Sequence, residues 1–118
     1  MFKGELVVSP LADGKLWEVK EKFSFCSLQY PEWVDINPGF VTDFASIPML
    51  LQWYEQPATG KHRRASIAHD FLYQMGLGSR KDADDTFLYL MNFDGVSYMK
   101  RYAMYWAVRA FGGLHYAV

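Results

Sequence analysis

Ionisable side chains interrupt three otherwise apolar segments of the chain, at residues 39–48, 68–73 and 79–87. The residues concerned are Asp43, His69, Asp70, Arg80 and Asp84. A buried carboxylate or imidazole costs free energy unless it is paired. Each of these residues therefore needs either a structural partner or a function.

The spacing of the second and third segments predicts which side chains meet. We expect both segments to be helical, and the short connection at residues 75–78 makes them antiparallel neighbours. His69 and Asp84 are equally far from the centre of that turn, and so are Tyr73 and Arg80. The sequence therefore predicts that His69 opposes Asp84 and that Tyr73 opposes Arg80.

A carboxylate that holds an imidazole fixes its tautomer and raises its basicity. The second ring nitrogen of His69 is then available to bind a metal, to activate water or to bond to the backbone. Asp70 points about 100° away around the helix. We expect it to do a different job, such as anchoring the loop that contains Asp43.

Asp43 lies where an expected strand ends, just before a turn-like segment at residues 45–48. If the sheet packs on the helix pair, Asp43 reaches His69 or Asp70. Asp43, His69 and Asp84 would then offer oxygen and nitrogen ligands for zinc or another divalent cation.

The same residues also fit an acid–base site without a metal, with Asp70 as a further catalytic candidate. In either case Tyr73 and Arg80 would support the reacting groups. The structural alternative is that the His69–Asp84 pair only fixes the register of two helices and that Asp43 caps a turn. These alternatives stay open at the level of the residues.

The elements that must position these side chains follow from periodicity and turn signals. Residues 15–25 alternate between apolar and polar side chains, which predicts one half-buried strand. Residues 33–36 and 40–44 are further strand candidates, and helices are expected over residues 63–74 and from Ser79 to about residue 92. A third helix should begin at Ser97 and end at a glycine cap at residues 112–113. Arg109 on that helix is expected to pair with an acid or to stack on Tyr105 or Trp106.

Together these elements predict an α+β fold in one domain spanning residues 1–118. An N-terminal antiparallel sheet of hairpins should pack against a C-terminal bundle of three helices. The net charge of −1 and the interleaved charges indicate no nucleic-acid partner. No apolar run approaches the roughly 18 residues of a membrane span. The single cysteine, Cys26, excludes an internal disulfide and is expected in the core.

Four motifs identify a resemblance. They are Gly-Phe-x-Thr-Asp-Phe-Ala-Ser-x-Pro at residues 39–48, His-Asp-x-Leu-Tyr at 69–73, Ser-Arg-x-x-Ala-Asp-x-x-Phe at 79–87 and Tyr-x-x-Val-Arg-x-Phe-Gly at 105–112. With them the chain resembles the bacteriophage and prophage proteins grouped as DUF1353, a family of unknown function. The resemblance implies a phage origin and a late role, because such genes commonly occur among tail and lysis genes.

Two functions from different classes follow as expectations. The first is a virion-associated structural or accessory component of the tail or neck, whose partners are other phage proteins. The second is a small hydrolase of the peptidase or amidase kind, metal-dependent or not, that acts on the bacterial cell wall during entry or lysis. The N-terminus lacks the layout of a signal peptide, so we expect synthesis in the host cytoplasm and residence in the virion.

Overall fold

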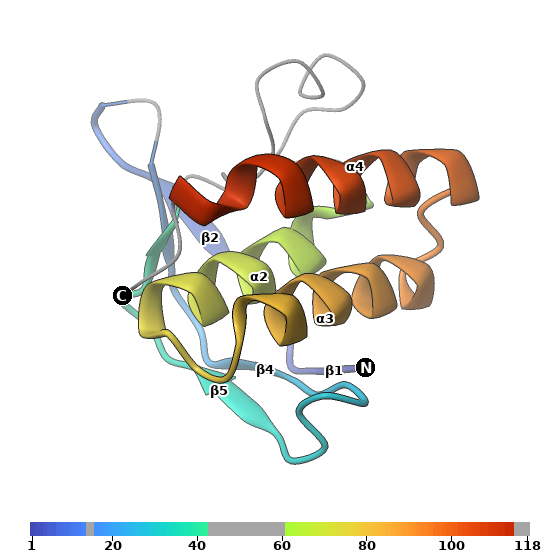
Figure 1. Ribbon diagram of the computed structural model, residues 1–118. Helices are drawn as coiled ribbons and strands as arrows, with labels where there is room; N and C mark the ends of the chain where they lie inside the picture. Colours follow the sequence, from blue (N-terminus) through green and yellow to red (C-terminus); the bar gives the residue numbers. More distant parts are fainter. Residues whose placement is uncertain (14–15, 43–60, 115–118) are drawn as a thin grey trace.

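The computed structural model describes residues 1–13, 16–42 and 61–114, and within it the side chains of residues 111 and 114 are not described. The fold is α+β, with the strands in the N-terminal half and the helices in the C-terminal half, as the sequence predicts (Figure 1). The strands are β1 (Phe2–Lys3), β2 (Val8–Pro10), β3 (Trp17–Val19), β4 (Phe23–Phe25), β5 (Val34–Ile36) and β6 (Val41–Thr42). The helices are α2 (Arg63–Met75), α3 (Arg80–Phe93) and α4 (Tyr98–Phe111), followed by the 3-10 turn η1 (Gly112–Leu114).

The strands form two antiparallel sheets rather than one. The first has the order β1-β4-β5 and the second the order β2-β3-β6. The single strand expected over residues 15–25 is wrong, because it is divided into β3 and β4, which belong to different sheets. The alternation fails at Glu21, which is exposed, and there the chain leaves one sheet for the other.

The helix boundaries follow capping chemistry. The Ser79 side chain accepts a hydrogen bond from the Asp82 amide at 3.0 Å, which is the predicted start of α3. Ser97 accepts from the Lys100 amide in the same way at the start of α4. At the end of α2, Gly76 adopts the left-handed conformation with φ 63°, which favours glycine.

α4 ends where the sequence predicts, with Gly112 as its C-cap residue, but this glycine lacks the left-handed conformation of a typical glycine cap. Gly112 has a right-handed φ of −66° and continues into η1. A Cβ atom at this position would lie 2.5 Å from the Tyr73 hydroxyl oxygen and 3.2 Å from its ring. Gly112 is therefore needed for close packing and not for its backbone conformation.

The core lies between the helices and the sheets. The helices run side by side, with α3 in contact with both α2 and α4, and β1, β4 and β5 pass beneath them in the view of Figure 1. Phe2 stacks on Phe23 at 5.4 Å and meets Phe93 of α3 at 6.1 Å, while Ser27 and Thr86 share a buried hydrogen bond of 2.8 Å. Cys26 is half-buried rather than a core residue.

Candidate functional site

A buried carboxylate, Asp84 of α3, lies at the point where the three helices meet. Its relative exposure is 0%, and both carboxylate oxygens are occupied. Oδ1 accepts hydrogen bonds from His69 Nε2 at 2.7 Å and from the Tyr73 hydroxyl at 2.5 Å. Oδ2 accepts from the Arg109 guanidinium at 2.8 Å. Asp84 thus joins α2, through His69 and Tyr73, to α4, through Arg109.

The predicted His69–Asp84 contact is confirmed. His69 has 0% exposure, and its ring packs 4.1 Å from that of Tyr73 and 4.8 Å from that of Phe87. Burial lowers the pKa of His69, and the hydrogen bond to Asp84 offsets only part of this effect. The imidazole is therefore neutral and donates through Nε2, which leaves Nδ1 without a proton.

Nδ1 of His69 is buried and has no hydrogen-bond partner within the described parts of the chain. The hydroxyl of Ser66, one turn earlier on α2, is in the same situation. Buried polar atoms are nearly always satisfied, so two such atoms on one helix mark an unusual point in the core.

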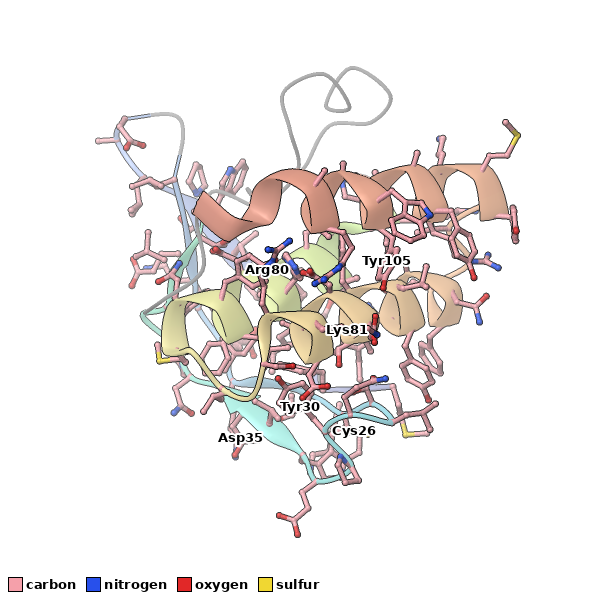
Figure 2. All side chains as sticks on the ribbon, in the orientation of Figure 1. Cys26, Tyr30, Asp35, Arg80, Lys81 and Tyr105 are labelled. Atoms are coloured by element: carbon pink, nitrogen blue, oxygen red, sulfur yellow. The ribbon has the colours of Figure 1, made fainter. Side chains whose placement is uncertain are left out.

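Tyr73 and Arg80, predicted to oppose each other, both converge on Asp84. The Arg80 Nε atom lies 3.6 Å from Oδ2 of Asp84, at the distance of an ion pair. Burial and the bond to Asp84 raise the pKa of the Tyr73 hydroxyl well above its ordinary value, so it acts as a donor at neutral pH. Arg80 points from α3 toward α4 (Figure 2), where it donates to the carbonyl oxygens of Val108 and Arg109. The Val108 carbonyl also accepts a hydrogen bond from the Gly112 amide, so Arg80 adds a side-chain contact at the end of α4.

Arg109 is the member of the site that sequence reasoning left least defined. It is paired with Asp84, and this hydrogen bond raises the pKa of its guanidinium. The signal lay in Gly112, the last residue of the motif at residues 105–112, and in the adjacent Gly113, which sit against Tyr73 and Arg80 respectively. The glycines allow the end of α4 to approach the cluster closely enough for Arg109 to reach it.

The electrostatics favour an ionised Asp84. Burial alone would raise the pKa of this carboxyl, but the hydrogen bonds from His69, Tyr73 and Arg109 outweigh burial and hold it below the ordinary value. With one carboxylate, two guanidinium groups and a neutral imidazole, the cluster carries a net positive charge. We call Asp84, His69, Tyr73, Arg80 and Arg109 the Asp84 cluster.

A second network lies beside this cluster. Tyr105 points from α4 toward α3 (Figure 2) and donates to Asp85 at 2.5 Å. Burial and the bond to Asp85 raise the pKa of Tyr105 to about 12. Lys81 completes the network with an ion pair of 2.6 Å to Asp85. The pair Asp84 and Asp85 therefore binds α4 twice, once inside the core and once at its edge.

The other two candidate residues lie apart from these contacts or outside the described structure. The Asp70 carboxylate accepts a hydrogen bond from Gln74 at 3.0 Å, and Gln74 also donates to the Val41 carbonyl of β6. Asp70 is thus placed near the end of β6, which precedes Asp43 in the chain. Asp43 itself lies outside the described residues, so its predicted approach to His69 stays a prediction.

Two further observations bear on what the molecule can bind. Within residues 1–13, 16–42 and 61–114, no group of three His, Cys, Asp or Glu side chains is arranged to hold a metal ion. In the same residues, no helix is long and apolar enough to cross a bilayer.

Two surface hollows are lined by other residues. One of about 460 Å³ is bordered by Lys61, Arg63, Arg64 and Asp94, among others. The other, of about 300 Å³, is bordered by Leu28, Tyr89 and Tyr102, among others.

Comparison with known proteins places this geometry in a family. Residues 17–108 match the model of the family described as "Protein of unknown function (DUF1353)". The chain is also 33% identical over 99 residues to "Uncharacterized protein y4jT" of Sinorhizobium fredii (strain NBRC 101917 / NGR234). That match takes in 82% of this chain but spans only 29% of the length of the relative. No solved structure matches the chain. The family model covers the strands from β3 onward and nearly all of the three helices, and the chain therefore belongs to the DUF1353 family.

Proposed function

We propose that this protein is a phage-encoded accessory component of the virion, at the tail or neck, and that the Asp84 cluster fastens its fold rather than performing chemistry. The observation that carries the second part is the sealing of the cluster. His69 and Asp84 both have 0% exposure, and each oxygen of Asp84 already accepts at least one hydrogen bond. A catalytic pair must reach its substrate or a water molecule, whereas a structural pair only needs its partners.

The phage part of the proposal is supported by the four motifs that resemble phage and prophage proteins. An accessory virion protein has other phage proteins as partners and needs a rigid fold more than an active site. The Asp84 cluster supplies rigidity, because its buried hydrogen bonds connect α2, α3 and α4 and favour one arrangement of the three helices.

The experiment is quantitative mass spectrometry of virions of the phage that would encode this chain, purified on a density gradient. We expect the chain to follow the capsid protein at a constant ratio across the gradient fractions. A cytoplasmic host enzyme measured in the same fractions is the control for contamination. Recovery of the chain only with that enzyme would overturn the virion proposal.

A specific observation favours a second candidate function, a metal-dependent hydrolase that acts on the cell wall. Nδ1 of His69 and Oγ of Ser66 are buried without hydrogen-bond partners in the described chain. An imidazole whose Nε2 is held by a carboxylate and whose Nδ1 is unprotonated has the form of a zinc ligand with its supporting carboxylate. Asp43 would have to complete the ligand set in this case.

Metal analysis of the purified protein separates the two candidates. The hydrolase predicts stoichiometric zinc that is lost in both His69→Gln and Asp43→Asn, together with release of fragments from purified cell walls. Asp35→Asn is the matched control, because Asp35 is an exposed carboxylate on β5. The structural proposal predicts no retained zinc in any of these chains and no cell-wall cleavage.

A further inference from the structure

The outward face of α4 is an uninterrupted apolar stripe. Met99, Ala103, Trp106 and Ala110 are all exposed, with relative exposures of 82% for Met99 and 63% for Trp106. Their spacing of four, three and four residues keeps them on one side of the helix, as at the contact positions of a coiled coil. We call these four residues the α4 stripe.

The opposite face of α4 is apolar as well. Met104 and Val108 are buried in the core on that side. A surface helix normally presents charged residues to solvent, and a helix that is apolar on both faces is normally covered on both. The α4 stripe is therefore a candidate docking surface.

The charged residues of α4 lie outside the stripe, and both of its arginines make contacts within the chain. Arg101 donates to the Val96 carbonyl, and its guanidinium lies 5.3 Å from the ring of Tyr98. Arg109 is bound to Asp84. The stripe itself carries no charge, so the surface that covers it must be apolar.

We propose that the partner is a second copy of this chain, bound through the α4 stripe with the two helices antiparallel about a two-fold axis. Such an axis through the middle of the stripe places residues equidistant from its centre opposite each other. Met99 of one copy then faces Ala110 of the other, and Trp106 faces Ala103. Each large side chain meets a small one, which makes the surface complementary to itself, as a two-fold interface requires.

The alternative arrangement of two copies fits less well. In a parallel pair each residue faces its own counterpart, so Trp106 would meet Trp106 while Ala103 would leave a gap opposite Ala103. Packing at interface cores is as dense as in protein interiors. The alternation of large and small residues therefore selects the antiparallel pair.

The area of the stripe sets the strength of the association. The exposed parts of Met99 and Trp106, with the two alanines and the exposed Tyr98 at the border, give roughly 400–500 Å² per copy on the usual scale of ~150–250 Å² for a large side chain. Two copies then bury about 900 Å², which is below the ~1,000 Å² that a stable specific interface exceeds. We therefore expect a weak, reversible dimer.

Charge adds little to this interface. Lys100 of one copy lies level with Arg109 of the other. Because Arg109 is paired with Asp84, its repulsion of Lys100 should be weak. Because the contact is apolar, it should persist or strengthen at high salt. The proposal depends on α4 alone and holds or fails independently of the virion proposal.

The first test is sedimentation equilibrium of the full chain over a concentration series from micromolar to millimolar. We expect the average mass to rise from one chain to two and then to stop, at both low and high salt. A single-chain mass throughout the series would overturn the proposal. Continued growth beyond two chains would also overturn it, since a two-fold interface closes on itself.

Variants that exchange large and small residues test the arrangement. Trp106→Ala leaves two alanines opposite each other, and Ala103→Trp places two tryptophans opposite each other, so each single change should weaken the dimer at least ~10-fold. The double variant with both changes restores large against small and should return the dimer to near its original strength. Trp33→Ala, at an exposed tryptophan directly before β5, is the matched control and should leave the dimer unchanged.

Circular dichroism of each variant checks that the fold is intact. We expect an intact fold, because the substituted positions are exposed. Equal dimerisation of all variants would overturn the α4 stripe as the interface. Loss of the dimer in the single variants without its return in the double variant would overturn the antiparallel arrangement.

Discussion

The two faces of α4 differ in a way that reverses the usual distribution of side chains. Toward the core, its last turn contributes Arg109, which pairs with a carboxylate of 0% exposure. Toward solvent, Trp106 is 63% exposed, and the other residues of the α4 stripe are apolar as well. A buried charge and an exposed apolar face are both costly. The buried charge is paired within the chain, whereas we propose that a second copy covers the exposed apolar face.

The comparison teaches where each kind of change should act. The Asp84 cluster is satisfied by residues of the same chain, so damage to it should appear as lost stability. The α4 stripe makes its contacts outside the chain, so damage to it should appear as lost association with little change in stability.

The largest effect is expected for Asp84→Asn. The change keeps the shape of the side chain but removes the negative charge that faces Arg80 and Arg109, and breaking a buried ion pair costs about 3–5 kcal/mol. Urea unfolding measures the loss. Asp85→Asn, the adjacent and partly exposed carboxylate, is the control and should cost about 1 kcal/mol. Equal losses of unfolding free energy at the two positions would show that the contribution of Asp84 to stability does not depend on its burial.

The next effect concerns the close approach of α4 to the cluster. Gly112→Ala places a methyl group 2.5 Å from the Tyr73 hydroxyl oxygen and should lower the free energy of unfolding by about 1–3 kcal/mol. The same change at an unhindered helical glycine would stabilise the fold. Gly113→Ala is the matched variant, because its methyl group meets only the end of the Arg80 side chain at 3.1 Å. We expect the midpoint of thermal unfolding to fall clearly less for Gly113→Ala than for Gly112→Ala. A Gly112→Ala variant that is more stable than the natural chain would contradict the structure.

The pH dependence of stability should report on His69. Because burial lowers its pKa in the folded state, the unfolded chain binds a proton at higher pH than the folded chain does. Stability from this residue is then present above the ordinary value of 6.5 and is lost as the pH falls below it, by up to about 1.4 kcal/mol per pH unit. Asp84 acts in a separate window, because its lowered pKa affects stability only as the pH falls below 3.8.

Denaturant unfolding between pH 8 and pH 5 measures this slope. His69→Gln keeps a donor for Asp84 but cannot titrate. The change of its unfolding free energy with pH should therefore be smaller than that of the natural chain by the contribution of one proton. Identical slopes in the two chains would contradict a buried neutral His69.

The smallest effect on stability is expected at the α4 stripe. Trp106→Ser should change the free energy of unfolding of the monomer by less than about 0.5 kcal/mol, as is usual for exposed positions. Val108→Ser, two residues along the same helix and fully buried, should cost several times more. Unfolding at low protein concentration, where the chain is monomeric, makes this comparison. A large loss for Trp106→Ser would place Trp106 in the fold of the single chain.

Much of the fold was predictable because its signals are local. The helix starts at Ser79 and Ser97 follow from capping side chains, and the His69–Asp84 contact follows from equal distances to a short turn. The division of residues 15–25 between two sheets was not predictable, because alternation tells which side chains share a face and not which strand pairs with which.

The site was predictable only as far as its two helices. His69 and Tyr73 meet Asp84 within one helical hairpin, which periodicity can describe. Arg109 comes from a third helix, whose distance from the cluster depends on how tightly α4 packs. The glycine pair that permits this packing has the same appearance in sequence as a helix cap, and only the position of Tyr73 beside Gly112 distinguishes the two roles.

The protonation state of the His69 imidazole shows whether the Asp84 cluster is sealed. In nitrogen-15 NMR spectra at pH 7, we expect a neutral ring with the proton on Nε2, and no change in either nitrogen signal when one equivalent of zinc is added. A charged ring, a proton on Nδ1, or a shift of the Nδ1 signal on addition of zinc would contradict the claim that the Asp84 cluster is a sealed structural network.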